Sequence, residues 1–357
     1  MPSLWADCLA KIMTRFGAST SLIVVLMSSL SFSFLGGSGS AWADIVPAPQ
    51  TCQVGIFVTA LRDFSLSEKS FTADFRLWSV CPDAELQPLK SMEFVDALES
   101  ETAFDTTQKK QNRSESFKTK DQVYWSQRDV SAIFSYNWNV NNYPFDRHVL
   151  KIPLEEVVSD TSVFTYTPDF KNSGYQRDMR LGSWEVTGFS IVEEKMAYST
   201  TFGDPTLTVK QGVYSRLSIL LPIRRVKAIS FFKLTTGVYV AFAVAMLSFF
   251  YETGQASLVS ARTSLLVGCL FAALVNMRAP ESVLGRTEGF TLVDQIHVVA
   301  ILYIFAAALA TVNSRLLNEA GQGKLALLRD RRLLFRLFSI SFVVLNVIMI
   351  SYAAIVG

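Results

Sequence analysis

The residue types that most often carry catalytic or metal chemistry are scarce in this sequence of 357 residues. It has two histidines, His148 and His297, and four cysteines, at spacings unlike those of a metal site. The patterns GxSxG, GxxxxGK(S/T) and GxGxxG, which mark nucleophiles and phosphate-binding loops, do not occur in it. We therefore expect no enzyme activity, no metal site and no cofactor. A membrane-anchored enzyme stays the least favoured alternative.

Disulfide chemistry is expected at Cys52 and Cys81. They flank a predicted hairpin of residues 53–61 and 71–77, in which apolar and polar residues alternate. Folding the hairpin about residues 66 and 67 sets the two cysteines opposite each other, within disulfide range. The alternative is two free thiols beside the hairpin.

Ion conduction could be carried by an apolar segment at 263–279 that contains Gly268, Asn276 and Arg278. A lipid-facing helix would not tolerate these residues easily. Steps of three and four residues define one face, which we expect to line a pore: Ser264, Gly268, Phe271, Val275, Arg278 and Ser282. The opposite face is suited to packing on neighbouring spans, and it consists of Leu266, Leu270, Leu274 and Met277.

The charged residues divide the chain into parts. Most of them lie in residues 44–227, whereas residues 228–357 are predominantly apolar. The net charge of +2 excludes a strongly basic nucleic-acid binder, so no nucleic-acid partner is expected.

Residues 1–43 have the features of a secretory signal peptide. Lys11 and Arg15 precede an apolar run at 22–35, and a Gly/Ser stretch then ends in Ala41-Trp42-Ala43. We expect cleavage after Ala43; a retained membrane helix is the alternative.

Residues 44–227 are expected to form an extracytoplasmic β-sandwich. Besides the hairpin, strands are predicted at 130–139, 148–156, 184–195 and 207–223, without a helical period between them. The polar stretch 84–120 is expected to form loops with one short strand.

Residues 228–357 are expected to form a membrane domain with spans at about 229–251, 263–279, 292–312 and 334–356. The exported sandwich places the connection 313–333 in the cytoplasm, and its five basic residues agree with the positive-inside rule. Arg224, Arg225 and Lys227 lie on the opposite side, so partners in the exported domain are expected to hold them.

Several segments resemble the pentameric ligand-gated ion channels, the Cys-loop receptor superfamily. Tyr143-Pro144-Phe145-Asp146-Arg147-His148 resembles their Phe-Pro-Phe-Asp-x-Gln loop. The cysteines that close this loop in animal members would fall on Tyr136 and Leu150, so the chain resembles prokaryotic members. Residues 213–225 are similar to the last ectodomain strand, which ends in a basic pair.

The pore helix and its following loop give the most extensive match, without a gap from Ala261-Arg262 to Asp294. Three positions depart from the family pattern. Gly237 stands where the first span usually has proline, Gly285 where Leu-Pro usually ends the pore helix, and Pro280 lies inside it.

The resemblance implies a homopentamer in a bacterial inner membrane, opened by a small-molecule or proton effector that binds the periplasmic domain. A ring of Phe271 would form a hydrophobic gate, and a ring of Arg278 would concentrate anions. Alternatively, Phe271 is a core aromatic between helices. A non-conducting receptor of the same fold, permanently shut at Phe271, is the main rival function.

The resemblance also implies site residues in the exported domain. Asp63, Asp146 and Arg225, with Pro144 and Phe145, would couple the two domains; ordinary surface ion pairs are the alternative. Tyr198 and Phe202, on the hairpin at about 198–206, are the aromatics available to an effector, or else they are idle loop residues. Ser260-Ala261-Arg262 is similar to the Pro-Ala-Arg of anion channels, which favours anions, although Glu252 could contribute below it.

Overall fold

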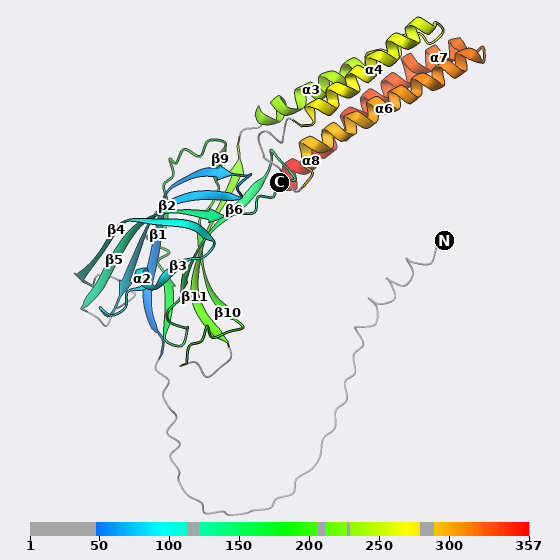
Figure 1. Ribbon diagram of the computed structural model, residues 1–357. Coiled ribbons are helices and arrows are strands. Elements are labelled where there is room, and N and C mark those ends of the chain that lie inside the picture. The colour runs from blue at the N-terminus through cyan, green and yellow to red at the C-terminus, as the bar shows by residue number, and fades with distance from the viewer. Residues whose placement is uncertain are drawn as a thin grey trace, which may run out of the picture. The chain divides into compact units, whose positions relative to one another are not determined.

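The computed structural model describes residues 48–112, 117, 121–205, 211–226, 229–278 and 289–356. Within these ranges, a β-rich domain is followed by four helical segments long and apolar enough to cross a membrane (Figure 1). The predicted fold class, a β-rich domain followed by a four-helix membrane domain, is confirmed. The signal-peptide interval 1–43 and the pore-face residue Ser282 lie outside the described residues.

The β-rich domain consists of two sheets packed on one core. The first has the order β4 (Ala97–Gln111), β5 (Gln122–Ser135), β2 (Ser70–Cys81), β1 (Gln50–Ser65) and β7 (Phe164–Pro168), with β8 (Gly174–Tyr175) also paired to β1. The second has the order β10 (Ser190–Tyr198), β11 (Gly212–Arg225), β6 (Arg147–Glu156) and β3 (Met92–Phe94), with β9 (Trp184–Val186) also paired to β11. A single turn of helix, α2 (Pro88–Ser91), precedes β3.

The hairpin of β1 and β2 has the register expected from the sequence at its open end. Gln53 pairs with Val80 and Val58 with Phe75, and irregularities beyond Val58 shift the pairing toward the turn. Next to the first of these pairs, Cys52 and Cys81 form a disulfide with buried sulfurs. The disulfide thus joins β1 and β2 at the open end of the hairpin.

Strand β4 corrects the expectation that 84–120 is mostly loop. This strand of fifteen residues pairs antiparallel with β5 at the edge of the first sheet, with irregularities at Leu98 and Ala103. Almost all of its residues are exposed. Because neither face is buried, apolar and polar residues do not alternate along the strand, and the sequence lacks the pattern that predicts one. The predicted strand 184–195 is also divided, into β9 and β10.

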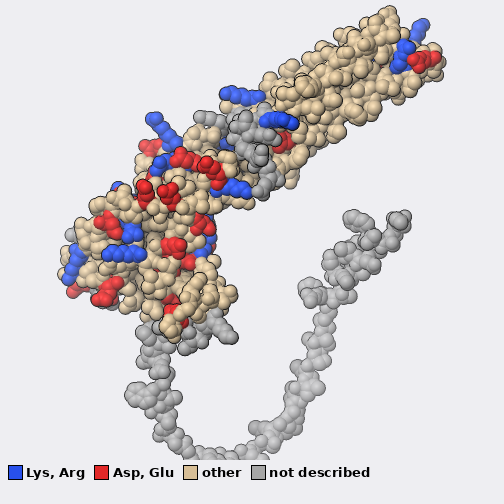
Figure 2. Space-filling view, viewed as in Figure 1, with Lys and Arg blue, Asp and Glu red and all other residues tan. Residues whose placement is uncertain are grey.

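The membrane domain begins with α3 (Ile229–Leu247), which η2 (Ser248–Phe250) extends as a short 3-10 helix. It continues with α4 (Ala256–Asn276) and α6 (Leu292–Glu319). The last span combines α7 (Gly323–Leu328), the π-helix η3 (Arg329–Leu334) and α8 (Phe335–Val356). Helix α4 starts seven residues earlier than expected, because serines and Arg262 obscure its apolar period. On the face shown in Figure 2, charged side chains cover the β-rich domain but hardly occur along the helices.

Candidate functional site

A buried ion pair joins the end of β11 to the loop before β6. Arg225 donates from Nε to Oδ1 of Asp146 at 2.9 Å, and from Nη2 to Oδ2 at 3.0 Å. The two side chains are only 8% and 1% exposed. Such a two-point contact fixes the relative orientation of both groups. It supplies the partner that Arg225 was expected to need.

Aromatic rings enclose the pair. The guanidinium carbon of Arg225 lies 3.9 Å from the ring centroid of Trp184 and 4.9 Å from that of Tyr143. His148 places Nε2 3.0 Å from Asp146 Oδ2, and its ring lies 5.0 Å from that of Trp138. We call Asp146, His148, Arg225, Tyr143 and Trp184 the Arg225 cluster. Cation–π contacts and hydrogen bonds replace the water that these charges lose.

The environment of Asp146 lowers its pKa. Burial alone raises the pKa of this carboxyl, but hydrogen bonds from His148 and Arg225, together with the positive charge of Arg225, outweigh that effect. The carboxyl pKa therefore lies below its ordinary value of 3.8. Asp146 is ionised at neutral pH and holds Arg225 as a charged pair.

Of the other predicted coupling residues, Pro144 and Phe145 lie in the loop before β6, whereas Asp63 lies apart from the Arg225 cluster. Pro144 is buried and Phe145 half-buried, and the Phe145 ring lies 5.8 Å from that of Phe231 in α3. Asp63 does not join the cluster: it is exposed on β1 and forms no ion pair with Arg225 among the described residues. His148, rather than a second carboxylate, completes the cluster.

One side of α4 is left uncovered by the residues that the structure describes. Its buried residues recur at helical spacing, as Arg262, Leu266, Cys269 and Ala273. Five of the six predicted pore-face residues are exposed, and Phe271 is 68% exposed: Ser264, Gly268, Phe271, Val275 and Arg278. Leu274, which was expected to pack on neighbouring spans, is 47% exposed within this chain. Leu270 and Met277 are partly buried.

Arg262 is not on the uncovered side. Its side chain is fully buried, and Nη1 lies 2.7 Å from Oδ2 of Asp330 in η3. Ser314 of α6 donates to the same carboxylate at 2.8 Å, and Arg329 donates to the Ser314 hydroxyl at 2.7 Å. The charge of Arg262 is thus neutralised inside the protein. The one sequence signal for this partner is that Asp330 is a single acid within a run of arginines at 329–332.

Three aromatic rings gather near the start of β11. The rings of Tyr198, Phe202 and Tyr214 lie 5.2 to 6.0 Å apart, centroid to centroid. The Tyr198 hydroxyl donates to Glu155 at 2.7 Å, and Arg216 pairs with the same carboxylate. Desolvation and the Glu155 hydrogen bond raise the pKa of Tyr198. The structure therefore brings together the two predicted effector residues and adds three: Glu155, Tyr214 and Arg216.

These groups suit binding and conformational coupling. Among the described residues, no three His, Cys, Asp or Glu side chains are grouped so that they could hold a metal ion. No protein-family model matches the chain, and no curated protein matches it. The layout, a β-rich domain followed by four helices able to span a membrane, is compatible with a membrane receptor or a channel.

Proposed function

We propose that this chain is one subunit of a homopentameric ligand-gated ion channel of the Cys-loop receptor superfamily. It lies in a bacterial inner membrane with the β-rich domain in the periplasm. Five copies of α4 surround a water-filled pore, and an effector bound to the β-rich domain opens it. The observation that carries this proposal is the uncovered side of α4.

That side differs in chemistry from the uncovered side of α8. Between Leu337 and Ile348, every exposed residue of α8 is aliphatic, as expected for contact with lipid. The exposed residues of α4 include Ser257, Ser260, Ser264 and Gly268. Polar groups in contact with hydrocarbon are costly, so this surface is better suited to water or to neighbouring copies.

Phe271 forms the gate and Arg278 sets the sign of the permeant ion. A ring of exposed phenylalanines narrows the pore and excludes water in the closed state. Arg262 is the only charged residue within α4, and Asp330 neutralises it in the interior. The nearest exposed charge that follows the helix is Arg278, two residues past its end. We therefore propose that the pore favours anions.

Strand β11 connects effector binding with the pore. Tyr214 and Arg216 lie near its beginning and Arg225 at its end, roughly 30–36 Å away at the rise of an extended strand. The three rings and Glu155 hold a small-molecule effector, while Phe145 carries movement to Phe231 in α3. Gating requires that the effector bind the open and closed states with different affinity.

Currents through planar bilayers test this function. Purified full-length protein is measured under unequal KCl, as wild type and as Phe271→Ala, with Phe305→Ala as the matched control on an exposed position of α6. We expect Phe271→Ala to raise the current, Phe305→Ala to leave it unchanged, and the reversal potential to lie near that of chloride. Silence from folded wild type and Phe271→Ala alike would contradict the channel and favour a non-conducting receptor.

A further inference from the structure

Two arginines lie directly opposite each other at the membrane-helix end of the second sheet. Arg147 of β6 pairs in register with Arg224 of β11, which also pairs with Glu185 of β9. Like charges at such cross-strand positions repel and destabilise the sheet. Glu185 compensates only Arg224, with both guanidinium contacts at 3.0 to 3.1 Å.

Arg147 keeps an uncompensated charge. It is exposed, and no acidic side chain in the described part of the chain pairs with it. The row Arg147–Arg224–Glu185 therefore carries one net positive charge. Repulsion between Arg147 and Arg224 costs free energy in the empty protein. An anion bound between the two guanidinium groups would remove that cost.

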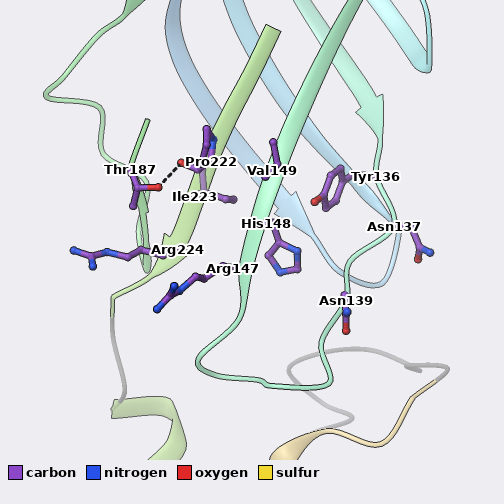
Figure 3. A pocket seen from close by; sticks show the side chains of 10 residues that line it. All are labelled: Tyr136, Asn137, Asn139, Arg147, His148, Val149, Thr187, Pro222, Ile223 and Arg224. Atoms are coloured by element: carbon purple, nitrogen blue, oxygen red, sulfur yellow. Dashed lines mark hydrogen bonds between the residues drawn. The ribbon is translucent and has the colours of Figure 1, made fainter. Parts of the chain in front are cut away.

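A cavity of about 700 Å³ lies beside this row (Figure 3). Arg147 and Arg224 line it together with His148 and three uncharged polar residues, Asn137, Asn139 and Thr187. Val149 and Pro222 supply an apolar surface, whereas the side chain of Ile223 is buried. None of the described residues that line the cavity carries a carboxylate. The volume and the mixture of apolar surface with few polar groups are typical of small-molecule sites.

We propose that this cavity binds a soluble organic anion with a carboxylate or phosphate group. The guanidinium groups of Arg147 and Arg224 hold the anionic group through charge-assisted hydrogen bonds. The side-chain amides bind polar substituents, and the apolar surface holds the body of the ligand. This site is separate from the aromatic cluster at Tyr198, and it does not depend on whether the protein conducts ions.

His148 connects an occupant of this cavity with the Arg225 cluster. His148 is one of the residues that line the cavity, its side chain is only 2% exposed, and its Nε2 lies 3.0 Å from Asp146 Oδ2. An occupant of the cavity would therefore lie beside a residue that contacts the Asp146–Arg225 pair.

Isothermal titration of the full-length protein in detergent tests the site. Phenyl phosphate carries the anion and an apolar body, and inorganic phosphate carries the anion alone. We expect saturable binding with one site per chain, tighter for phenyl phosphate. Arg147→Gln should weaken it roughly tenfold or more, because it removes a charge-assisted hydrogen bond. The exposed Arg177, which does not line the cavity, provides the matched control Arg177→Gln, expected to be neutral.

A second variant, which is expected to strengthen binding, distinguishes loss of the site from misfolding. Glu185→Gln releases Arg224 from its competing carboxylate, so it should tighten phenyl phosphate binding several-fold. Damage to the fold would not improve binding. The proposal is overturned if wild type shows no saturable binding of phenyl phosphate. It is also overturned if Arg147→Gln and the control Arg177→Gln weaken binding equally, or if Glu185→Gln fails to tighten it. Binding that occurs only to vesicles of anionic lipid would equally overturn a soluble ligand.

Discussion

Asp146 has the largest number of charged contacts in the Arg225 cluster. It receives Arg225 through both carboxylate oxygens and has His148 within hydrogen-bond distance, while almost no solvent reaches it. Removing one partner of such a buried pair leaves the other as an uncompensated charge, which costs about 3–5 kcal/mol. The free energy of unfolding of the protein should therefore depend on whether Asp146 is ionised.

Asp146→Asn should destabilise the protein by about 3–5 kcal/mol at pH 7. Because the folded pKa of Asp146 lies below 3.8, the stabilisation is fully present above that value and disappears as the pH falls below it. Thermal unfolding of wild type and variant in detergent, at pH 7 and toward pH 3, measures both effects.

The matched control is Asp129→Asn. Asp129 pairs with Arg76 at 2.8 Å, but this pair is at the surface, so its loss should cost under about 1 kcal/mol. Equal losses in the two variants would mean that burial does not strengthen the Asp146 pair.

At the scale of elements, the β1–β2 hairpin is closed by a covalent bond. The Cys52–Cys81 disulfide joins residues separated by 29 positions and restricts the unfolded chain. Replacing both cysteines by alanine should lower stability by about 3 kcal/mol, seen as a lower midpoint of thermal unfolding. An unchanged midpoint would show that strand pairing alone determines the stability of the hairpin.

Helices α3 and α4 approach closely at Gly237. A Cβ atom added there would lie 2.6 Å from the side-chain oxygen of Asn276 in α4. Gly237→Ala should therefore cost about 1–3 kcal/mol, and Asn276→Ala in the same chain should recover most of it. Thermal unfolding of the single and double variants measures this coupling.

Gly268 provides the control for the glycine substitution. It lies on the uncovered side of α4, and a Cβ atom there meets nothing within 4 Å. Gly268→Ala should be neutral or stabilising by up to about 1 kcal/mol, because alanine favours the helix. If both glycine variants behave alike, helix propensity rather than contact with Asn276 explains the result.

At the scale of the whole molecule, the sequence was informative where a contact is local or periodic. The spans follow from long apolar runs, and the position of Cys52 opposite Cys81 from the register of a single hairpin. Five residues of the exposed side of α4 follow from steps of three and four. The fold class could therefore be predicted without coordinates.

Contacts between distant segments could not be predicted in this way. Arg262 and Asp330 are 68 positions apart, and neither lies in a pattern that specifies the other. Glu155 and Arg216 meet through the pairing of β6 with β11, which no local signal establishes. Edge strand β4 could not be predicted from the sequence, because both of its faces are largely polar and exposed.

Assembly is the property on which the proposed pore depends. We expect the purified protein to contain five copies of the chain, which native mass spectrometry in detergent counts directly. The uncovered, serine-bearing side of α4 is then enclosed by neighbouring copies. A monomer or dimer under conditions that preserve the fold would leave that side without a partner.

The most direct test of the pore is thiol accessibility during current recording. In a Cys269→Ala background, Gly268→Cys and Phe271→Cys place thiols on the uncovered side of α4, and Val347→Cys places one on the aliphatic side of α8. We predict that a water-soluble methanethiosulfonate reagent changes the current of the two α4 variants and not that of Val347→Cys. Currents that respond at none of these positions, or equally at all three, would contradict a pore lined by α4.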